Sequence, residues 1–204
     1  MNMKKIVASA SALALTAAVA VGGTLAYLTQ EKTITNTFTY SADHSNITLT
    51  LQEHKYNPKA ANDKDGFYGN ITGELTDTGN NNYYVVPDAK VDKDPVVSLT
   101  SANDCYVFVK VDNQLGNKID TADLVNQITV TNTWTALKGE DGVYYKENIN
   151  TGNGSSLPVF SSITFKDAAT IGAMAEPANI VVTAYAVTAV DFDTPAEAWA
   201  VFDK

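Results

Sequence analysis

The segment 104–112 (DCYVFVKVD) constrains the fold of this chain more than any other stretch. Small apolar side chains occupy every second position, and aromatic side chains stand between most of them, so both faces of the segment are largely apolar. A period of two is that of a β-strand, and apolar residues on both faces indicate a strand that other elements cover on both sides. The pattern therefore predicts the central strand of a sheet.

Shorter patterns of the same kind recur along the chain, with turn residues between them. The further segments that predict strands are 33–40, 47–52, 95–100, 127–137, 142–146, 157–165 and 179–190. The first two could pair antiparallel, and 127–137 and 142–146 predict a hairpin around a Gly-containing loop. Many short strands with only small helices predict an all-β fold, a jelly-roll-like β-sandwich of roughly seven to nine strands.

Three short segments carry helix signals. Residues 120–125 begin with an acidic residue, and residues 167–176 are rich in Ala and end before Pro177. Residues 194–197 form a capping box, with Thr as N-cap, Pro at the first helical position and Glu three residues after the cap. We therefore expect a C-terminal helix through Trp199 and Phe202.

Residues 1–26 are typical of an export signal peptide. Two Lys precede a run of small and apolar residues (6–21), and small residues follow at positions suited to cleavage between Ala26 and Tyr27. An uncleaved membrane anchor is the alternative, but the apolar run of about 16 residues is shorter than the roughly 20 that a spanning helix needs. We expect contact with the membrane only before signal cleavage.

Charge and cysteine content exclude several classes of function. The chain has 14 Lys, no Arg and 23 acidic residues, and its formal charge of -9 becomes -11 once residues 1–26, with two Lys and no acidic residue, are removed. Such a protein lacks the basic face that nucleic acids require. One Cys excludes an internal disulfide framework and multi-Cys metal sites. We expect an acidic, secreted protein that packing stabilises.

No catalytic or cofactor motif emerges from the sequence. His44 and His54 lie in polar surroundings and are predicted to be solvated loop residues, while Cys105 shares a face with valines and is predicted to be a buried thiol, not a nucleophile. The segment 62–66 (NDKDG) hints at a calcium loop, but both ends of the EF-hand pattern fail. We expect no enzymatic activity, no cofactor and no metal site.

Residues 53–82 form a polar stretch rich in Asn, Asp and Gly. Compact domains rarely carry a loop of this length without a role, so a binding surface, a short extra hairpin and a solvated insertion remain alternatives. The predicted organisation is a signal peptide (1–26), an N-terminal strand (27–40) and a single β-sandwich domain (41–204) with this polar insertion.

The segments 22–29 (GGTLAYLT) and 35–39 (TNTFT) resemble the signal-peptide and early mature region of the SipW-dependent exported proteins of Gram-positive bacteria, the TasA/camelysin family. Further matches lie at 86–87, 93–97, 104–111 and 180–187. The resemblance implies a jelly-roll domain, export through a dedicated signal peptidase and assembly into extracellular fibres of the biofilm matrix. Camelysin relatives have also been classed as metalloproteases, but this sequence has no zinc-ligand pattern.

The N-terminal segment suggests a mechanism for such fibres. Cleavage after Ala26 would free an extended, Thr-rich segment (27–40) that can add a strand to the sheet of the next subunit. Such a contact is heterologous and propagates into an open filament. The same segment can instead pair within its own domain. The partners expected are further copies of the chain and a minor matrix subunit, and the assembly strand carries Leu28, Ile34, Phe38 and Tyr40.

Two other classes of function remain open. A monomeric cell-surface adhesive or carbohydrate-binding module is one, because jelly rolls often bind sugars and Tyr68, Tyr83 and Tyr84 lie in polar segments where exposure is expected. A secreted hydrolase is the other, although the sequence has no recognisable catalytic constellation.

Overall fold

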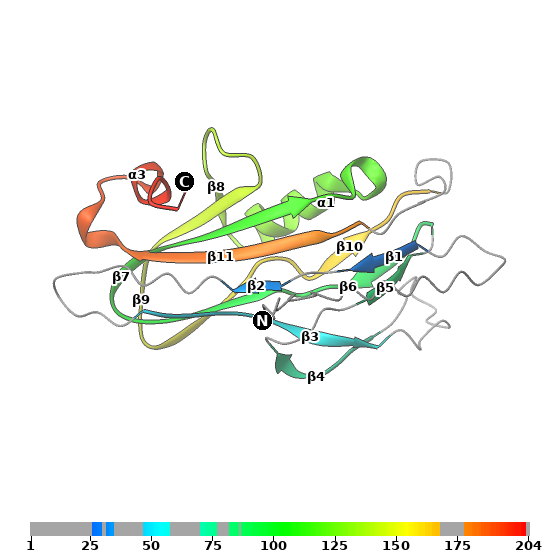
Figure 1. Ribbon diagram of the computed structural model, residues 1–204, viewed down its shortest axis with the longest axis horizontal. Coiled ribbons are helices and arrows are strands. Elements are labelled where there is room, and N and C mark those ends of the chain that lie inside the picture. The colour runs from blue at the N-terminus through cyan, green and yellow to red at the C-terminus, as the bar shows by residue number, and fades with distance from the viewer. Residues whose placement is uncertain are drawn as a thin grey trace, which may run out of the picture.

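A computed structural model describes residues 26–29, 32–34, 47–57, 70–76, 82–85, 87–167 and 178–202. These ranges form an all-β fold with a few short helices, as the sequence predicts (Figure 1). The main sheet contains β2 (Lys32–Ile34), β3 (Thr48–Asn57), β4 (Asn70–Thr76), β7 (Val96–Asn113), β8 (Thr135–Ala136), β9 (Val143–Pro158) and β11 (Ile180–Thr188). Two smaller sheets pair β1 (Ala26–Thr29) with β5 (Asn82–Val85), and β6 (Lys90–Asp92) with β10 (Ser162–Thr164).

Strand β7 is the centre of the main sheet, which confirms the prediction for 104–112. Its first half lies between β3 and β9, and its second half lies between β11 and β9. The segments 95–100 and 104–112 were expected as separate strands, but they form one strand whose pairing with β9 shifts register around Ser101. The register shifts let a single long strand bend and continue through both halves of the sheet.

The two faces of β7 pack into two different hydrophobic clusters. Cys105, Val107 and Val109 belong to the main core, while Tyr106 and Phe108 belong to a second cluster that includes Trp199. All five residues are buried, as the alternating pattern predicts.

The C-terminal helix α3 (Pro195–Trp199) closes the second cluster, and it ends before Phe202, which was expected to be helical. The Thr194 hydroxyl accepts a hydrogen bond from the Glu197 amide at 3.2 Å, which confirms the predicted N-cap. The Glu197 carboxylate accepts in turn from the Asp193 amide at 3.0 Å, one residue earlier than in the usual capping box. The helix brings the Trp199 ring to 5.3 Å from Phe108 and 5.1 Å from Tyr185, measured between ring centroids.

The prediction of a strand at 127–137 is wrong for its first half. Helix α1 (Thr121–Asn126) begins at the predicted acidic residue, Asp120, whose carboxylate caps it, and the chain continues as the π-helical turn η2 (Gln127–Thr131). The Gln127 side-chain oxygen accepts from the amides of Ser161 and Ser162, which fixes the turn against β10. This tertiary contact outweighs the strand preference of the β-branched residues in the turn.

The second half of that segment does form the predicted hairpin, because β8 pairs antiparallel with the start of β9. The predicted strand 157–165 is interrupted. Its first two residues end β9, residues 159–161 leave the sheet, and β10 then pairs with β6. The strand predicted at 179–190 is β11, followed by the short turn η3 (Ala189–Asp191). A further turn, η1 (Gly116–Lys118), precedes α1. The helix expected at 167–176 falls almost wholly outside the described residues.

The strand expected at 47–52 is present as β3, and it continues to Asn57. Its first half pairs with β7 and its second half with β4. Of the strand expected before it at 33–40, the structure describes only residues 33 and 34, and these pair with β11. The polar stretch 53–82 therefore begins inside the sheet and contributes a β3–β4 hairpin, the second of the three alternatives that the sequence left open.

Candidate assembly site and buried polar network

The N-terminal segment is paired at two separate places. Strand β2 runs parallel to β11 at the edge of the main sheet, with Lys32 opposite Val182 and Ile34 opposite Ala184. Every other strand pair among the described residues is antiparallel. Three residues of parallel ladder supply few hydrogen bonds, so β2 is a weakly attached edge strand.

Strand β1 pairs antiparallel with β5 in a small sheet of its own. Ala26 lies opposite Val85 and Leu28 lies opposite Tyr83. The bond between Ala26 and Tyr27, where we expect signal cleavage, therefore lies within β1. Of the expected assembly residues, Leu28 and Ile34 are in paired strands, while Phe38 and Tyr40 lie outside the described residues.

Glu53 in β3, Tyr83 in β5 and Lys93 form a buried polar network. The Lys93 ammonium nitrogen lies 3.1 Å from one Glu53 carboxylate oxygen, and the Tyr83 hydroxyl donates to the other at 2.5 Å. The side chains of Lys93 and Glu53 are 0% and 1% exposed. Tyr83 was expected to be exposed, and that expectation is wrong. Glu53, the first residue of the polar stretch 53–82, is buried in β3. The three residues are far apart in sequence, and no local pattern joins them.

The surroundings of Lys93 are unusual for an ammonium group. The Lys93 nitrogen lies about 6 Å from two aromatic ring centroids, at 6.0 Å from Tyr83 and 5.8 Å from Phe160. Burial lowers the pKa of Lys93 below its ordinary value, although the charges of Glu53 and Asp94 and the hydrogen bond to Glu53 oppose that shift. Desolvation therefore outweighs pairing at this site.

A second acid–base pair adjoins the network. The His54 ring nitrogen Nδ1 lies 2.5 Å from the Asp94 carboxylate, whose other oxygen accepts from the His54 amide at 3.2 Å. His54 was expected in a solvated loop, but it stands in β3, and its side chain is 31% exposed. Because Glu53 and His54 contact Lys93 and Asp94 respectively, two adjacent pairs tie β3 to the segment that leads into β7.

Cys105 is buried, as predicted. Its thiol donates to the Ser101 hydroxyl at 3.3 Å and lies 3.4 Å from the Asn103 carbonyl oxygen. Burial raises the pKa of the Cys105 thiol, the Asp104 charge adds to this, and the Ser101 hydrogen bond opposes it. A protonated, enclosed thiol is a poor nucleophile.

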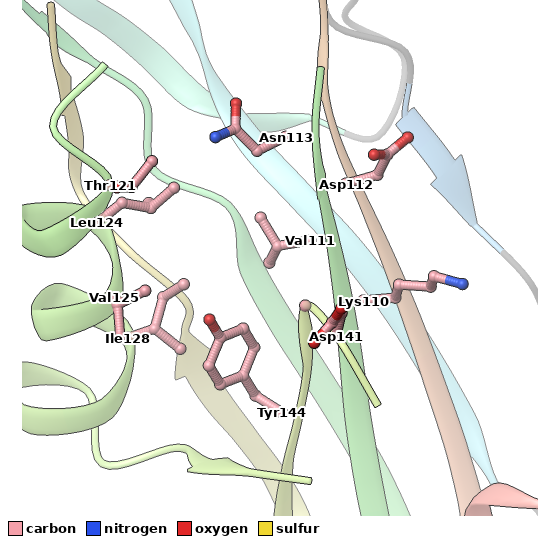
Figure 2. A pocket seen from close by; sticks show the side chains of 11 residues that line it. Lys110, Val111, Asp112, Asn113, Thr121, Leu124, Val125, Ile128, Asp141 and Tyr144 are labelled. Atoms are coloured by element: carbon pink, nitrogen blue, oxygen red, sulfur yellow. The ribbon is translucent and has the colours of Figure 1, made fainter. Parts of the chain in front are cut away.

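A pocket of ≈ 340 Å³ lies between α1–η2 and the sheet. Figure 2 shows Leu124, Val125 and Ile128 on the helical side, facing Val111 and Tyr144 on the strands. The Lys110 side chain points away from this apolar centre (Figure 2). The pocket is suited to an apolar side chain, and its lining has no paired nucleophile and base.

The described ranges contain no cluster of three or more His, Cys, Asp or Glu that could hold a metal ion. Nor does any helix in those ranges have the length and apolar character needed to cross a membrane. His44 and the segment 62–66 lie outside the described residues, as does Tyr68.

Comparison with protein-family models, with curated proteins and with solved structures finds no match to this chain. A functional assignment therefore depends on the residues and geometry of the chain itself.

Proposed function

We propose that this chain is a secreted structural protein of the extracellular or biofilm matrix, related to the TasA/camelysin group, and that it assembles into fibres by N-terminal strand addition. Its domain would be a jelly-roll-like β-sandwich, and its role would be structural, not enzymatic. The export-type N-terminus, the acidic charge and the all-β fold support this proposal.

The observation that carries the proposal is the pairing of β2 with β11. A three-residue strand lies parallel at the edge of an otherwise antiparallel sheet, and β2 covers only Val182–Ala184 of the nine residues of β11. The edge of β11 offers the same backbone donors and acceptors to a strand from its own chain or from a neighbour. An exchange of β2 between subunits therefore replaces like with like, at little cost in hydrogen bonding.

Only Tyr83, one of the three tyrosines considered for a carbohydrate-binding module, has a described side chain, and it gives that alternative no support. Tyr83 is fully buried, and its hydroxyl is engaged by Glu53. A sugar-binding platform needs exposed rings, so Tyr83 is not available for one.

Two purified forms test the proposal, one beginning at Tyr27 and one at Ser41. We expect negative-stain microscopy at equal concentration and neutral pH to show filaments from the longer form only. Circular dichroism should show that both forms are folded. Filaments from both forms, or from neither, would contradict assembly through the N-terminal segment. N-terminal sequencing of protein recovered outside the cell tests export separately, and we expect Tyr27 as the first residue.

A point variant sharpens the same test. Thr33→Pro removes one backbone donor from β2 and disfavours its place in a ladder, whereas Lys32→Ala keeps the backbone unchanged. We expect filaments from Lys32→Ala and few or none from Thr33→Pro. Equal assembly of the two variants would argue against β2 as the exchanged strand.

A further inference from the structure

The two oxygens of the Glu53 carboxylate have different partners. One lies 3.1 Å from the Lys93 side-chain nitrogen, and the other accepts a short hydrogen bond, 2.5 Å, from the Tyr83 hydroxyl. An amine and a hydroxyl thus approach one carboxyl group from two sides. All three residues are at most 1% exposed, so bulk water does not reach them.

Burial also favours the uncharged forms of this pair. An ion pair that leaves water loses more hydration energy than it easily regains, and the aromatic rings of Tyr83 and Phe160 lie near the amine. Burial lowers the pKa of Lys93 and so favours its neutral amine. Transfer of the Lys93 proton to the adjacent Glu53 carboxylate would leave this amine beside a carboxylic acid. A desolvated neutral lysine is a good nucleophile.

We propose that Lys93 and Glu53 condense into an intramolecular isopeptide bond in the folded protein. The Lys93 nitrogen lone pair forms a bond to the Glu53 carboxyl carbon. The oxygen near Lys93 leaves with its own proton and one amine proton as a single water molecule. The reaction needs no oxidant or reductant, and its product is a secondary amide.

Tyr83 has a defined part in this step. Negative charge develops on the Glu53 oxygen that does not leave, and this is the oxygen to which the Tyr83 hydroxyl already donates. A donor placed in advance on such an oxygen stabilises the tetrahedral intermediate. The enclosed site then protects the amide, because hydrolysis would require water to return.

The cross-link would give the chain a covalent constraint of the kind that a disulfide gives many secreted proteins. The chain has one Cys and so forms no disulfide within itself. A bond between residues 40 positions apart closes a loop that contains β4, β5 and β6, and it joins β3 to the segment leading into β7. Closing a long loop restricts the unfolded chain and stabilises the fold. This inference is independent of fibre assembly.

The proposal is tested by the intact mass of the chain, which is purified in its folded state and then measured under denaturing conditions. We expect a mass lower than that of the sequence by one water, and a protease digest that contains one branched peptide joining Glu53 to Lys93. A succinimide at the Asp–Gly steps 65–66 or 141–142 also loses one water. Hydroxylamine cleaves a succinimide but leaves the isopeptide, so treatment separates the two. The full sequence mass, or a digest with both peptides linear, would overturn the proposal.

Two Lys→Arg variants provide matched controls. Lys93→Arg keeps a cation at the site but cannot form this amide, and we expect its full sequence mass. Lys146→Arg changes a partly buried lysine elsewhere in the fold, whose amine donates to the Asn132 carbonyl oxygen and the Thr133 hydroxyl. We expect the mass deficit to persist in this variant. A water-sized deficit that survives in Lys93→Arg would exclude Lys93 as the nucleophile. With Tyr83→Phe we expect a smaller cross-linked fraction in protein collected soon after synthesis, and an unchanged fraction would remove Tyr83 from the mechanism.

Discussion

Leu28 lies directly opposite Tyr83 in the antiparallel pair of β1 and β5. The Tyr83 side chain is fully buried, and its hydroxyl donates to Glu53. Tyr83 therefore joins the two parts of the protein: its backbone pairs with the N-terminal segment, and its side chain belongs to the buried polar network. Displacement of β1 would remove one flank of the strand that carries Tyr83.

Tyr83→Phe should destabilise the fold by about 1–3 kcal/mol, because the buried Glu53 oxygen would lose its donor while the ring still fills its place. Urea unfolding, followed by far-UV circular dichroism, gives the change in the free energy of unfolding. Tyr106→Phe, in the second cluster, is the control, and we expect a smaller effect from it. Equal effects would mean that the hydrogen bond to Glu53 contributes no specific stability.

Lys93→Met should cost at least about 3–5 kcal/mol, because it leaves an uncompensated acid in the interior and also removes the nucleophile of the proposed cross-link. The double variant Lys93→Met with Glu53→Gln removes both ionisable groups, and we expect it to be more stable than Lys93→Met alone. Chemical denaturation of the three proteins completes the comparison. A double variant that is less stable than the single one would contradict the picture of a pair with a dominant desolvation cost.

Gly142→Ala should be clearly more destabilising than Gly139→Ala. Both glycines have positive φ, 71° and 93°, so each Ala meets similar backbone strain. A Cβ at Gly142 would lie 2.5 Å from the Val111 carbonyl oxygen, whereas a Cβ at Gly139 meets nothing within 4 Å. We expect about 1 kcal/mol for Gly139→Ala and a further 1–3 kcal/mol for Gly142→Ala. Thermal unfolding of both variants measures the difference, and equal costs would argue against this close approach.

Cys105 should contribute a loss of stability at high pH. Burial raises the pKa of its thiol above the ordinary value of 9.0. Below pH 9.0 both states hold the proton, and the contribution is fully present. As the pH rises further, the unfolded state ionises first and binds fewer protons, so stability falls through the folded-state pKa. Cys105→Ala should lack this component, and urea titrations of both proteins from pH 8 upward would reveal it. Parallel curves would contradict the shift.

Thr194→Ala should destabilise the second cluster by about 1 kcal/mol, because the Glu197 amide loses its cap at the start of α3. Near-UV circular dichroism and thermal unfolding report on the aromatic packing around Trp199. Thr135→Ala, at an exposed position of β8, serves as the control. A cap variant as stable as that control would show that α3 is held by packing alone.

Local sequence patterns correctly predicted the central strand and the start of the last helix. The alternation around Val107 identifies the central strand, and the order Thr194-Pro195 with Glu197 identifies the last helix. The strand expected at 127–137 failed because α1 continues into a π turn that Gln127 anchors to residues more than thirty positions away. No period in the sequence carries that information.

The buried network was missed for a similar reason. Glu53 reads as polar in its own neighbourhood, and only its contacts with Lys93 and Tyr83, 40 and 30 positions away, make its burial tolerable. The strand at 33–40 was expected from its alternation, and residues 32–34 are extended, but alternation alone does not specify a parallel partner.

The parallel course of β2 and β11 determines how this domain would carry mechanical load. Tension that enters at Lys32 and leaves beyond Thr188 pulls the two strands past each other along their length, since both run in the same direction. In that geometry the hydrogen bonds between Lys32–Ile34 and Val182–Ala184 share the force and must yield together. An antiparallel strand in the same place, pulled from the ends that lie together, would open one bond at a time. The direction of three residues thus decides whether this edge resists pulling by shear or opens like a zip.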